Sequence, residues 1–305
     1  MKIVIVGFGV QGKKRAIVAG KNCVAIVDPY EKGAHFKNIF EVPLDLFDAA
    51  MVCTPDSKKN EIIFYLLDNK KHILVEKPLL DSKHIKLTDI IKLSKIKNVT
   101  CYTAYNHRFE PHFINFKKFL ENEEIGKPYY IRLFYGNGTA RLVKESEWRD
   151  NEGGVLYDLA SHLLDTYMFW FGKKNLINLK SFMGNKFENK SHDHILFGAD
   201  SSPRLSAEIS MISWRNQFFA DFYFEHGSIH IDSLCKWGPS KLTFRKRKFP
   251  SGKPKEIVKV ITKNDPTWEN EFKYFKKLCE KRMNNISNDI WIQKQLKNLS
   301  KELQK

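Results

Sequence analysis

The chain has 305 residues, more than one ordinary hydrophobic core accommodates, and its length predicts about two domains. Its composition, 42% hydrophobic and 28% charged, excludes a largely disordered chain, and the lack of an apolar run of about 18 residues argues against a membrane span. The formal net charge of +16 is spread along the chain, which argues against nucleic-acid binding and favours attraction to a phosphate-bearing metabolite.

The N-terminus predicts a buried parallel strand followed by a dinucleotide-binding turn. Residues 2–6 form a β-branched run, Lys-Ile-Val-Ile-Val, that leads directly into Gly7-Phe-Gly9-Val-Gln-Gly12. Between a strand and a helix, the first glycine permits a tight turn, the second lets the backbone approach a pyrophosphate, and the third lets the helix pack closely on the strand. Because the strand starts at residue 2 with no signal peptide before it, we expect a cytoplasmic protein.

A second strand, residues 23–27, ends in Asp28. An acidic residue about 20 positions after the glycines is where a ribose 2′-hydroxyl binds, and it repels a 2′-phosphate. The cofactor predicted is therefore NAD, with NADP less favoured, although Lys32 and His35 lie nearby in sequence and would soften that preference. The alternative is that Asp28 and Pro29 form a simple turn.

Strands and helices continue to alternate through residue 104. A strand at 47–53 precedes Thr54-Pro55, a helix spans 57–69, a strand in the run 72–80 carries Glu76-Lys77-Pro78, a helix spans 81–96, and a last strand spans 99–104. This order predicts a doubly wound, mostly parallel Rossmann domain over residues 1–104. Lys77 then lies at the carboxyl edge of the sheet, where ligands bind. The alternative for Lys77 is a surface lysine at a strand end.

From residue 105 the character changes to strands without intervening helices, which predicts an α+β domain with a large, mostly antiparallel open sheet over residues 105–305. The predicted strands are residues 129–135, 176–183, 194–199, 205–213, 218–224, 228–231 and 241–246. One helix is expected at 111–120, and helices from 268 to the end, broken near 284–287, which can pack back on the first domain. We expect this domain to bind substrate and to form oligomers through its aromatic-rich sheet.

One helix of this second half carries candidate chemistry. It follows Gly153-Gly154 and places Asp158 and His162 four residues apart, so both project from one face. A histidine beside a carboxylate suits a general acid–base; the alternative is a buried histidine satisfied by local contacts. Upstream, Trp148-Arg149 combines an aromatic ring with a guanidinium, which suits a sugar or a carboxylate.

Five motifs, in this order, resemble the glucose-fructose oxidoreductase, inositol dehydrogenase and rhizopine-catabolism (Gfo/Idh/MocA) family. They are Gly7-x-Gly9-x-x-Gly12, Cys53-Thr54-Pro55, Glu76-Lys77-Pro78, Tyr105-Asn106-His107-Arg108-Phe109 and Gly153-Gly154-x-x-x-Asp158-x-x-x-His162. They span about the first 170 residues. Asn60 stands where many relatives have a histidine, and Ala104 where many have a glycine.

The resemblance implies roles for individual residues. Lys77 and His162 would be catalytic with Asp158 assisting, and all three would also contact substrate. The implied cofactor-binding residues are Gly7, Gly9, Gly12, Asp28, Thr54, Pro55, Glu76, Lys77 and Asn106. The other substrate-binding candidates are Arg108, Trp148 and Arg149.

We therefore hypothesise an enzyme that oxidises a secondary hydroxyl of a sugar, nucleotide sugar or cyclitol, or reduces the ketone, with NAD(H). Residues 135–141 with 148–150 resemble a branch associated with bacterial surface-polysaccharide metabolism. The alternatives are an NAD-dependent lyase or glycosidase-type enzyme that uses redox transiently, and a non-catalytic dinucleotide-binding sensor. We expect a homodimer or homotetramer, and no nucleic-acid, membrane or metal partner, since the cysteines lack metal-binding spacing.

Overall fold

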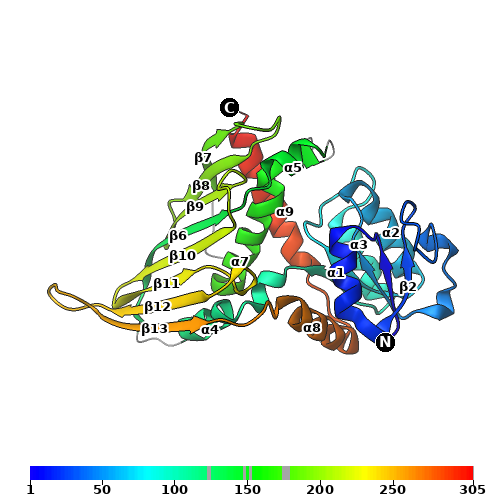
Figure 1. Ribbon diagram of the computed structural model, residues 1–305, viewed down its shortest axis with the longest axis horizontal. Helices are drawn as coiled ribbons and strands as arrows, with labels where there is room; N and C mark the ends of the chain where they lie inside the picture. Colours follow the sequence, from blue (N-terminus) through cyan, green and yellow to red (C-terminus); the bar gives the residue numbers. More distant parts are fainter. Residues whose placement is uncertain (122–124, 147–148, 151–152, 174–178, 305) are drawn as a thin grey trace. The chain divides into compact units, whose positions relative to one another are not determined.

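The computed structural model describes residues 1–121, 125–146, 149–150, 153–173 and 179–304. The chain forms two compact units, each treated below by itself (Figure 1). The first unit comprises Met1–Asn106 and Thr267–Gln293, and the second comprises His107–Pro266 and Lys294–Lys305. Within the residues that the structure describes, every helix is too short or too polar to cross a membrane.

The first unit contains a five-stranded parallel sheet in the order β2-β1-β3-β4-β5, which confirms the predicted Rossmann sheet. Its strands are β1 (Ile3–Val6), β2 (Cys23–Val27), β3 (Ala49–Val52), β4 (His72–Glu76) and β5 (Cys101–Ala104). Most of their side chains are apolar and buried on both faces, as in parallel sheets that helices cover on each side.

Helices cover the two faces of this sheet in different ways. Helices α2 (Asp56–Asp68) and α3 (Leu87–Ile96) bury apolar side chains on one face, together with the start of α9 (Ile286–Glu302). The other face is covered by α1 (Val10–Ala19) and by α8 (Thr267–Lys281). A segment from the C-terminal part of the chain thus completes the core of the N-terminal unit.

Helix α3 begins at Leu87, later than the predicted start at Asp81. The Asp81 carboxylate accepts a hydrogen bond from the backbone N–H of Leu87 at 3.0 Å, and the Asp81 N–H donates to the side chain of Gln293 at 2.5 Å. These two contacts use the polar groups of Asp81 in a loop, so the residues up to Lys86 do not join the helix.

The second unit contains an eight-stranded sheet in the order β13-β12-β11-β10-β6-β9-β8-β7. Of the described strand pairs, β6–β9 is parallel and the others are antiparallel, so the predicted mostly antiparallel sheet is confirmed. The strands are β6 (Pro128–Gly136), β7 (Lys180–Asn185), β8 (His194–Ala199), β9 (Arg204–Ser210), β10 (Gln217–Phe224), β11 (Gly227–Asp232), β12 (Ser240–Lys246) and β13 (Lys255–Ile261).

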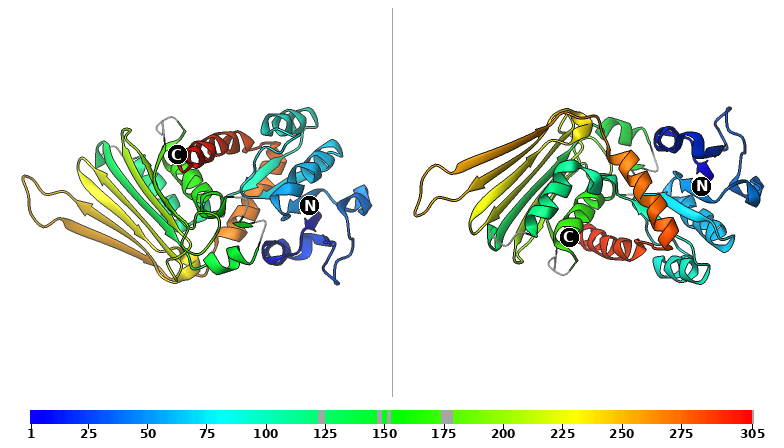
Figure 2. Two further views of the ribbon diagram at one scale, coloured as in Figure 1. Left: turned by 90° about the horizontal axis from the view of Figure 1, so that it is seen from above. Right: turned by 90° about the horizontal axis from the view of Figure 1, so that it is seen from below.

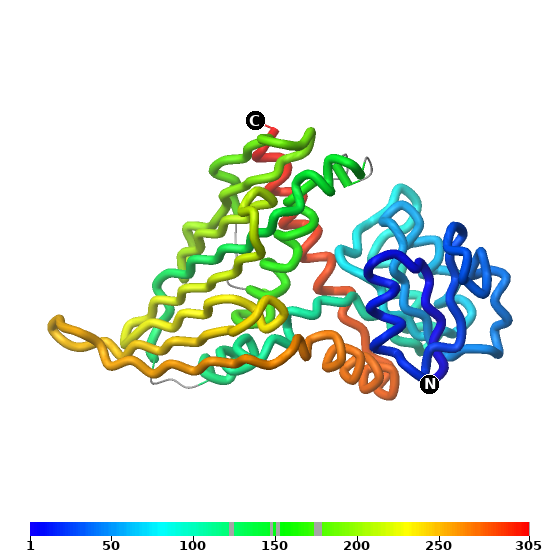
Figure 3. The backbone as a smooth tube through the Cα atoms, viewed as in Figure 1, coloured from blue at the N-terminus to red at the C-terminus, as the bar shows by residue number. Residues whose placement is uncertain are grey.

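Strand β13 has no counterpart among the predicted strands. It pairs with β12 in a long hairpin, visible in Figure 3 as the orange extension of the chain. Nearly all of its side chains are exposed, so it lacks the buried face that produces an alternating pattern. The predicted strand at 176–183 corresponds to β7, and its first three positions lie outside the described residues.

Among the residues that the structure describes, helices cover one face of this large sheet and leave the other open (Figure 2). Helices α4 (Pro111–Leu120) and α7 (Ser161–Phe171) pack on the covered face, where the Phe116 ring stacks on Phe222 at 3.9 Å and the Trp170 indole N–H donates to the carbonyl of Phe113. Figure 2 shows both helices on the same side of the strands. The open face carries aromatic pairs such as Phe134 and Phe219, with ring centroids 5.0 Å apart.

Candidate active site

The glycine turn after β1 has the geometry that a bound pyrophosphate requires. Gly7 has φ +87°, and a Cβ there would lie 2.8 Å from the carbonyl oxygen of Cys53; a Cβ on Gly12 would lie 1.9 Å from the carbonyl oxygen of Gly7. Both positions therefore exclude a side chain. A Cβ on Gly9 would meet no atom within 4 Å, so the backbone at Gly9 faces open space. The second glycine leaves room for a ligand at the N-terminus of α1.

Asp28 follows β2 and is held by backbone amides. One carboxylate oxygen accepts from the N–H of Phe8 at 2.7 Å, and the other accepts from Tyr30 and Glu31 at 2.8 and 2.9 Å. These hydrogen bonds favour the charged form and outweigh the opposing effect of partial burial, so the pKa of Asp28 is lowered. An ionised carboxylate is thereby tied to the glycine turn, where it can accept from ribose hydroxyls.

Thr54 lies between β3 and α2, beside the glycine turn. Its hydroxyl oxygen is buried and, within the described part of the chain, has no hydrogen-bond partner. A buried polar group without a partner is costly, and a bound ligand is one way to satisfy it. Together with open Gly9 and oriented Asp28, this hydroxyl fits a dinucleotide at the edge of the sheet. Pro55 is the N-terminal cap of α2 beside it.

Lys77 directly follows β4, at the carboxyl edge that also bears the glycine turn. The residues after it are braced by α2: the Lys59 ammonium donates to the carbonyl of Pro78 at 3.1 Å, and the Asn60 amide donates to the carbonyl of Leu80 at 3.0 Å. Lys59 and Asn60 are buried. Asn60, a departure from the family pattern, therefore positions the segment that carries Lys77.

A buried ion-pair cluster joins the glycine-turn helix to the Glu-Lys-Pro motif. The guanidinium of Arg15, on α1, contacts Glu76 at 2.6 Å and Glu271, on α8, at 2.7 Å. The Tyr102 hydroxyl donates to Glu271 at 3.3 Å, and Arg15 lies over the Trp268 ring. Burial raises the pKa of Glu271 to about 7, although Arg15 acts to lower it. Glu76 thus holds the end of β4 in place, next to Lys77.

In the second unit, Asp158 and His162 lie in one continuous helical stretch, but the part that carries Asp158 is not α-helical. Leu156–Ala160, which contains Asp158, forms a π-helical segment that leads into α7, and His162 is in the first turn of α7. A single π-helical turn inside an α-helix is frequent at functional sites. Gly154 has φ +52°, and a Cβ there would lie 2.5 Å from the carbonyl oxygen of His192, so only glycine allows this close approach.

Asp150 fixes the strand-connecting loop against which this helix starts. Its carboxylate accepts hydrogen bonds from the backbone N–H groups of Lys190 and Ser191 and from the Ser191 hydroxyl. These bonds lower the pKa of Asp150. The neighbouring Arg149 is exposed, and Trp148 lies outside the described residues. Within the predicted Trp-Arg-Asp motif, the aspartate is therefore a structural anchor.

The His162 ring is packed between two aromatic neighbours. It stacks on His107, with ring centroids 4.1 Å apart and an interplanar angle of 18°, and it meets Tyr135 edge-on at 5.9 Å. The pKa of Tyr135 is raised, chiefly by burial and also by the negative charges of Asp158 and Glu110. The charge of Asp158 therefore acts on Tyr135, whose ring meets that of His162, and the Tyr135 hydroxyl stays protonated.

Two other candidates are engaged by protein groups. Arg108 makes a bidentate pair with the buried carboxylate of Asp165, at 2.7 and 2.5 Å, which orients its guanidinium. The Asn106 amide donates to the hydroxyl of Thr267 at 2.9 Å. Their assignments to substrate and cofactor stay predictions.

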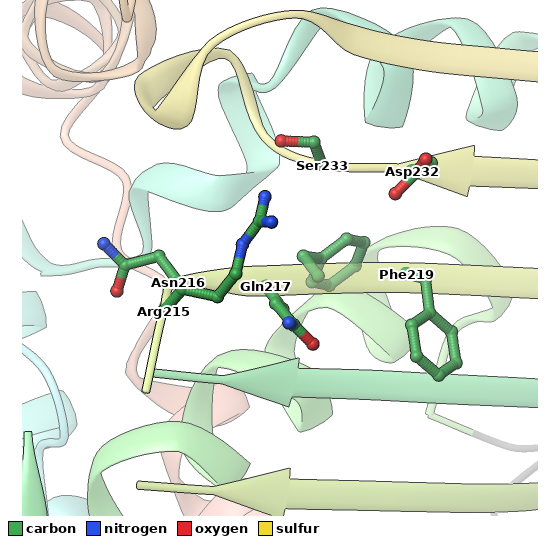
Figure 4. A pocket seen from close by; sticks show the side chains of 7 residues that line it. Arg215, Asn216, Gln217, Phe219, Asp232 and Ser233 are labelled. Atoms are coloured by element: carbon green, nitrogen blue, oxygen red, sulfur yellow. The ribbon is translucent and has the colours of Figure 1, made fainter. Parts of the chain in front are cut away.

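A pocket in the second unit is separate from these residues. It is lined by Arg215, Asn216, Gln217, Phe218, Phe219, Asp232 and Ser233 (Figure 4). Because side chains alternate along β10, Gln217 and Phe219 project from the open face, where Phe219 stacks on Phe134, whereas Phe218 packs toward Tyr135 on the covered face. Gln217 and Phe219 therefore line this pocket from the open face of the sheet.

The first unit has the five-stranded parallel sheet of a Rossmann domain, and the second is an α+β domain with a large, mostly antiparallel sheet. The chain belongs to the Gfo/Idh/MocA family, because residues 1–105 match its "NAD-binding Rossmann fold" and residues 117–238 its "C-terminal alpha/beta domain". The predicted family and NAD-binding domain are confirmed.

Named relatives cover part of the chain, and solved structures cover nearly all of it. The chain is 31% identical over 148 residues to the scyllo-inositol 2-dehydrogenase (NAD(+)) of Bacillus subtilis, covering 48% of this chain and 39% of the relative. It is 29% identical to the myo-inositol 2-dehydrogenase of Thermotoga maritima, covering 42% and 37%. The matches thus span less than half of either relative.

Two solved structures share the whole fold. The UDP-N-acetylglucosamine 3-dehydrogenase GnnA of Acidithiobacillus ferrooxidans has a TM-score of 0.80 at 14% identity, covering 99% of this chain and 97% of that one. A levoglucosan dehydrogenase in complex with NADH has a TM-score of 0.81 at 16% identity, covering 100% and 97%.

Sequence reasoning missed several residues of the site. No local sequence pattern predicts the contacts made by Arg15, Glu271 and Lys59, because their partners are not neighbours in sequence. The His107–His162 stack was missed for the same reason, although His107 stands inside a recognised motif. The first helix did offer a signal for Arg15: the residue shares a helix face with Gly12 and Ala19, and a charged residue on such a face indicates a buried ion pair.

Proposed function

We propose that the protein is an NAD-dependent oxidoreductase that interconverts a secondary hydroxyl and a ketone on a sugar, nucleotide sugar or cyclitol. The proposal rests on the groups that the structure gathers at the carboxyl edge of the first sheet. There, Gly9 faces open space, the Thr54 hydroxyl is buried without a partner among the described residues, Asp28 is ionised, and Lys77 follows the next strand. NAD, when bound, supplies the hydride acceptor, and NADH the donor.

Residues of this chain would accept the proton of the substrate hydroxyl and stabilise the negative charge on its oxygen. During oxidation His162 accepts the proton of the substrate hydroxyl, and Asp158 orients the imidazole. Lys77, as an ammonium, stabilises the developing alkoxide; fixed donors of this kind contribute about 3 kcal/mol to transition-state stabilisation. In reduction the same groups work in reverse, so His162 begins protonated.

The substrate class draws on the relatives. Dehydrogenases named for inositols and for UDP-N-acetylglucosamine are similar to this chain, and all of these compounds carry secondary hydroxyls on a ring. The motif at residues 135–141 adds the proposal that the substrate belongs to bacterial surface-polysaccharide metabolism.

A screen of sugars, cyclitols and nucleotide sugars, followed by NADH absorbance, tests the activity. With a substrate in hand, we expect Lys77→Ala and His162→Ala each to lower kcat by about 100-fold or more while NADH still binds. Near-normal turnover of both variants would refute the assignment. Product formation without NADH accumulation would instead identify a lyase that uses redox transiently, and NADH binding without any turnover would favour a sensor.

We also propose that the open face of the second sheet forms a homo-oligomer. It exposes Tyr223, which projects from the same face as the stacked Phe134–Phe219 pair, and this favours a covered surface. Light scattering of the wild type and of Tyr223→Glu tests this, since a charge in the contact would shift the protein toward monomer. A wild-type monomer would exclude it.

A further inference from the structure

A chain of three side chains in the second unit ends on His162. His107, from the short 3-10 helix Asn106–Phe109, stacks on the His162 ring at 4.1 Å. Lys236, from the 3-10 turn Cys235–Trp237, places its ammonium 3.2 Å from Nε2 of His107. His107 is fully buried, and Lys236 is half-buried over the Trp237 ring.

The Lys236 contact determines the protonation of His107. An ammonium group has only donors, so Nε2 of His107 must accept and cannot carry a proton. The His107 imidazole is therefore neutral. Its stacked partner is then the one ring of the pair that can take up a proton, because two cationic rings at this separation would repel each other strongly.

We propose that Lys236 and His107 are positioning residues that hold His162 in the neutral, proton-accepting form before hydroxyl oxidation. After transfer, the His162 imidazolium lies face to face with a neutral ring, an arrangement that attracts a cation to π-electrons. The transfer moves one proton from the substrate oxygen to the His162 nitrogen, and His107 gains none. The inference rests on the proposed function only in assigning that proton to the substrate.

The other groups around the pair are consistent with this state. Tyr135 is protonated and neutral, and Asp158 supplies negative charge. Burial raises the pKa of Glu110 to about 7; the negative charge of Asp265 also raises it, and the positive charge of Lys236 acts to lower it. The Lys236 ammonium, 3.2 Å from Nε2 of His107, is thus a cation in direct contact with the stacked pair.

The experiment is a histidine titration by NMR of ring-labelled protein without substrate. Spectra of His162→Gln and His107→Gln assign the two rings. In Lys236→Met we expect the pKa of the stacked pair to rise by about one pH unit, since a nearby positive charge is lost. Lys236→Arg should titrate like the wild type, and so should Lys241→Met, which removes an exposed lysine from β12. If Lys236→Met fails to fold, Lys236→Gln is used, with the same expected rise.

Kinetics provide the second measurement. The acid limb of the kcat/KM profile should move upward by the same amount in Lys236→Met and not in Lys236→Arg. An unchanged NMR titration in Lys236→Met or Lys236→Gln overturns the inference. The proposed function fails by a different result, full turnover of His162→Ala, which leaves the NMR titration to decide the inference separately.

Discussion

Replacing Arg15 by Met tests the buried cluster that links the glycine-turn helix to the strand before Lys77. The substitution keeps an unbranched side chain but removes the guanidinium from between Glu76 and Glu271. Breaking a buried ion pair by removing one partner costs about 3–5 kcal/mol, because the remaining charge stays buried without compensation. We expect a loss of that size in the free energy of unfolding at pH 7.

The pH dependence of this loss identifies Glu271 as its source. In the wild type, burial raises the pKa of Glu271 from 4.5 to about 7, so its contribution to stability is full below 4.5 and is lost as the pH rises to 7. Without Arg15 the folded-state pKa rises further, and the loss continues above pH 7. The gap between Arg15→Met and wild type should therefore widen by up to about 1.4 kcal/mol per pH unit.

Urea unfolding at pH 7, 8 and 9, followed by circular dichroism, measures both effects. Lys92→Met, which removes an exposed lysine from α3 in the same unit, is the control and should change stability by less than about 0.5 kcal/mol. Combining Arg15→Met with Glu271→Gln should remove the extra pH slope, because the amide does not titrate. A loss below about 1 kcal/mol for Arg15→Met, or a gap that does not change with pH, would refute the account.

The remaining predictions concern the glycine turn, the helix that braces the Lys77 segment and a buried carboxylate. Gly12→Ala should prevent the native turn and lower Tm strongly, whereas Gly9→Ala should keep Tm and weaken NADH binding at least about tenfold, as measured by fluorescence titration. Lys59→Met should cost about 1–3 kcal/mol by urea unfolding, while exposed Lys58→Met changes little. Because the pKa of folded Glu110 is raised from 4.5 to about 7, its contribution to the free energy of unfolding is lost as the pH rises from 4.5 to 7. Glu110→Gln should make this decline with pH shallower, and an unchanged decline would contradict the account.

Motifs predicted much of the first unit because its signals are local. A β-branched run, a glycine turn and a helix follow each other within about 20 residues, and Gly12 is required by the nearby carbonyl of Gly7 in the same turn. The start of α3 was missed because Asp81 bonds to Gln293, far along the chain. Strand β13 was missed because it has no buried face, so its residues show no period.

Short patterns of residue types were sufficient to predict the family, the Rossmann architecture and the candidate roles of Lys77 and His162. The contacts that hold the two sites in place became visible in the folded chain. Arg15 and Glu271 are 256 positions apart, and His107 and Lys236 are 129 apart. Such pairs meet through strand order and helix packing, which periodicity within a single segment does not encode.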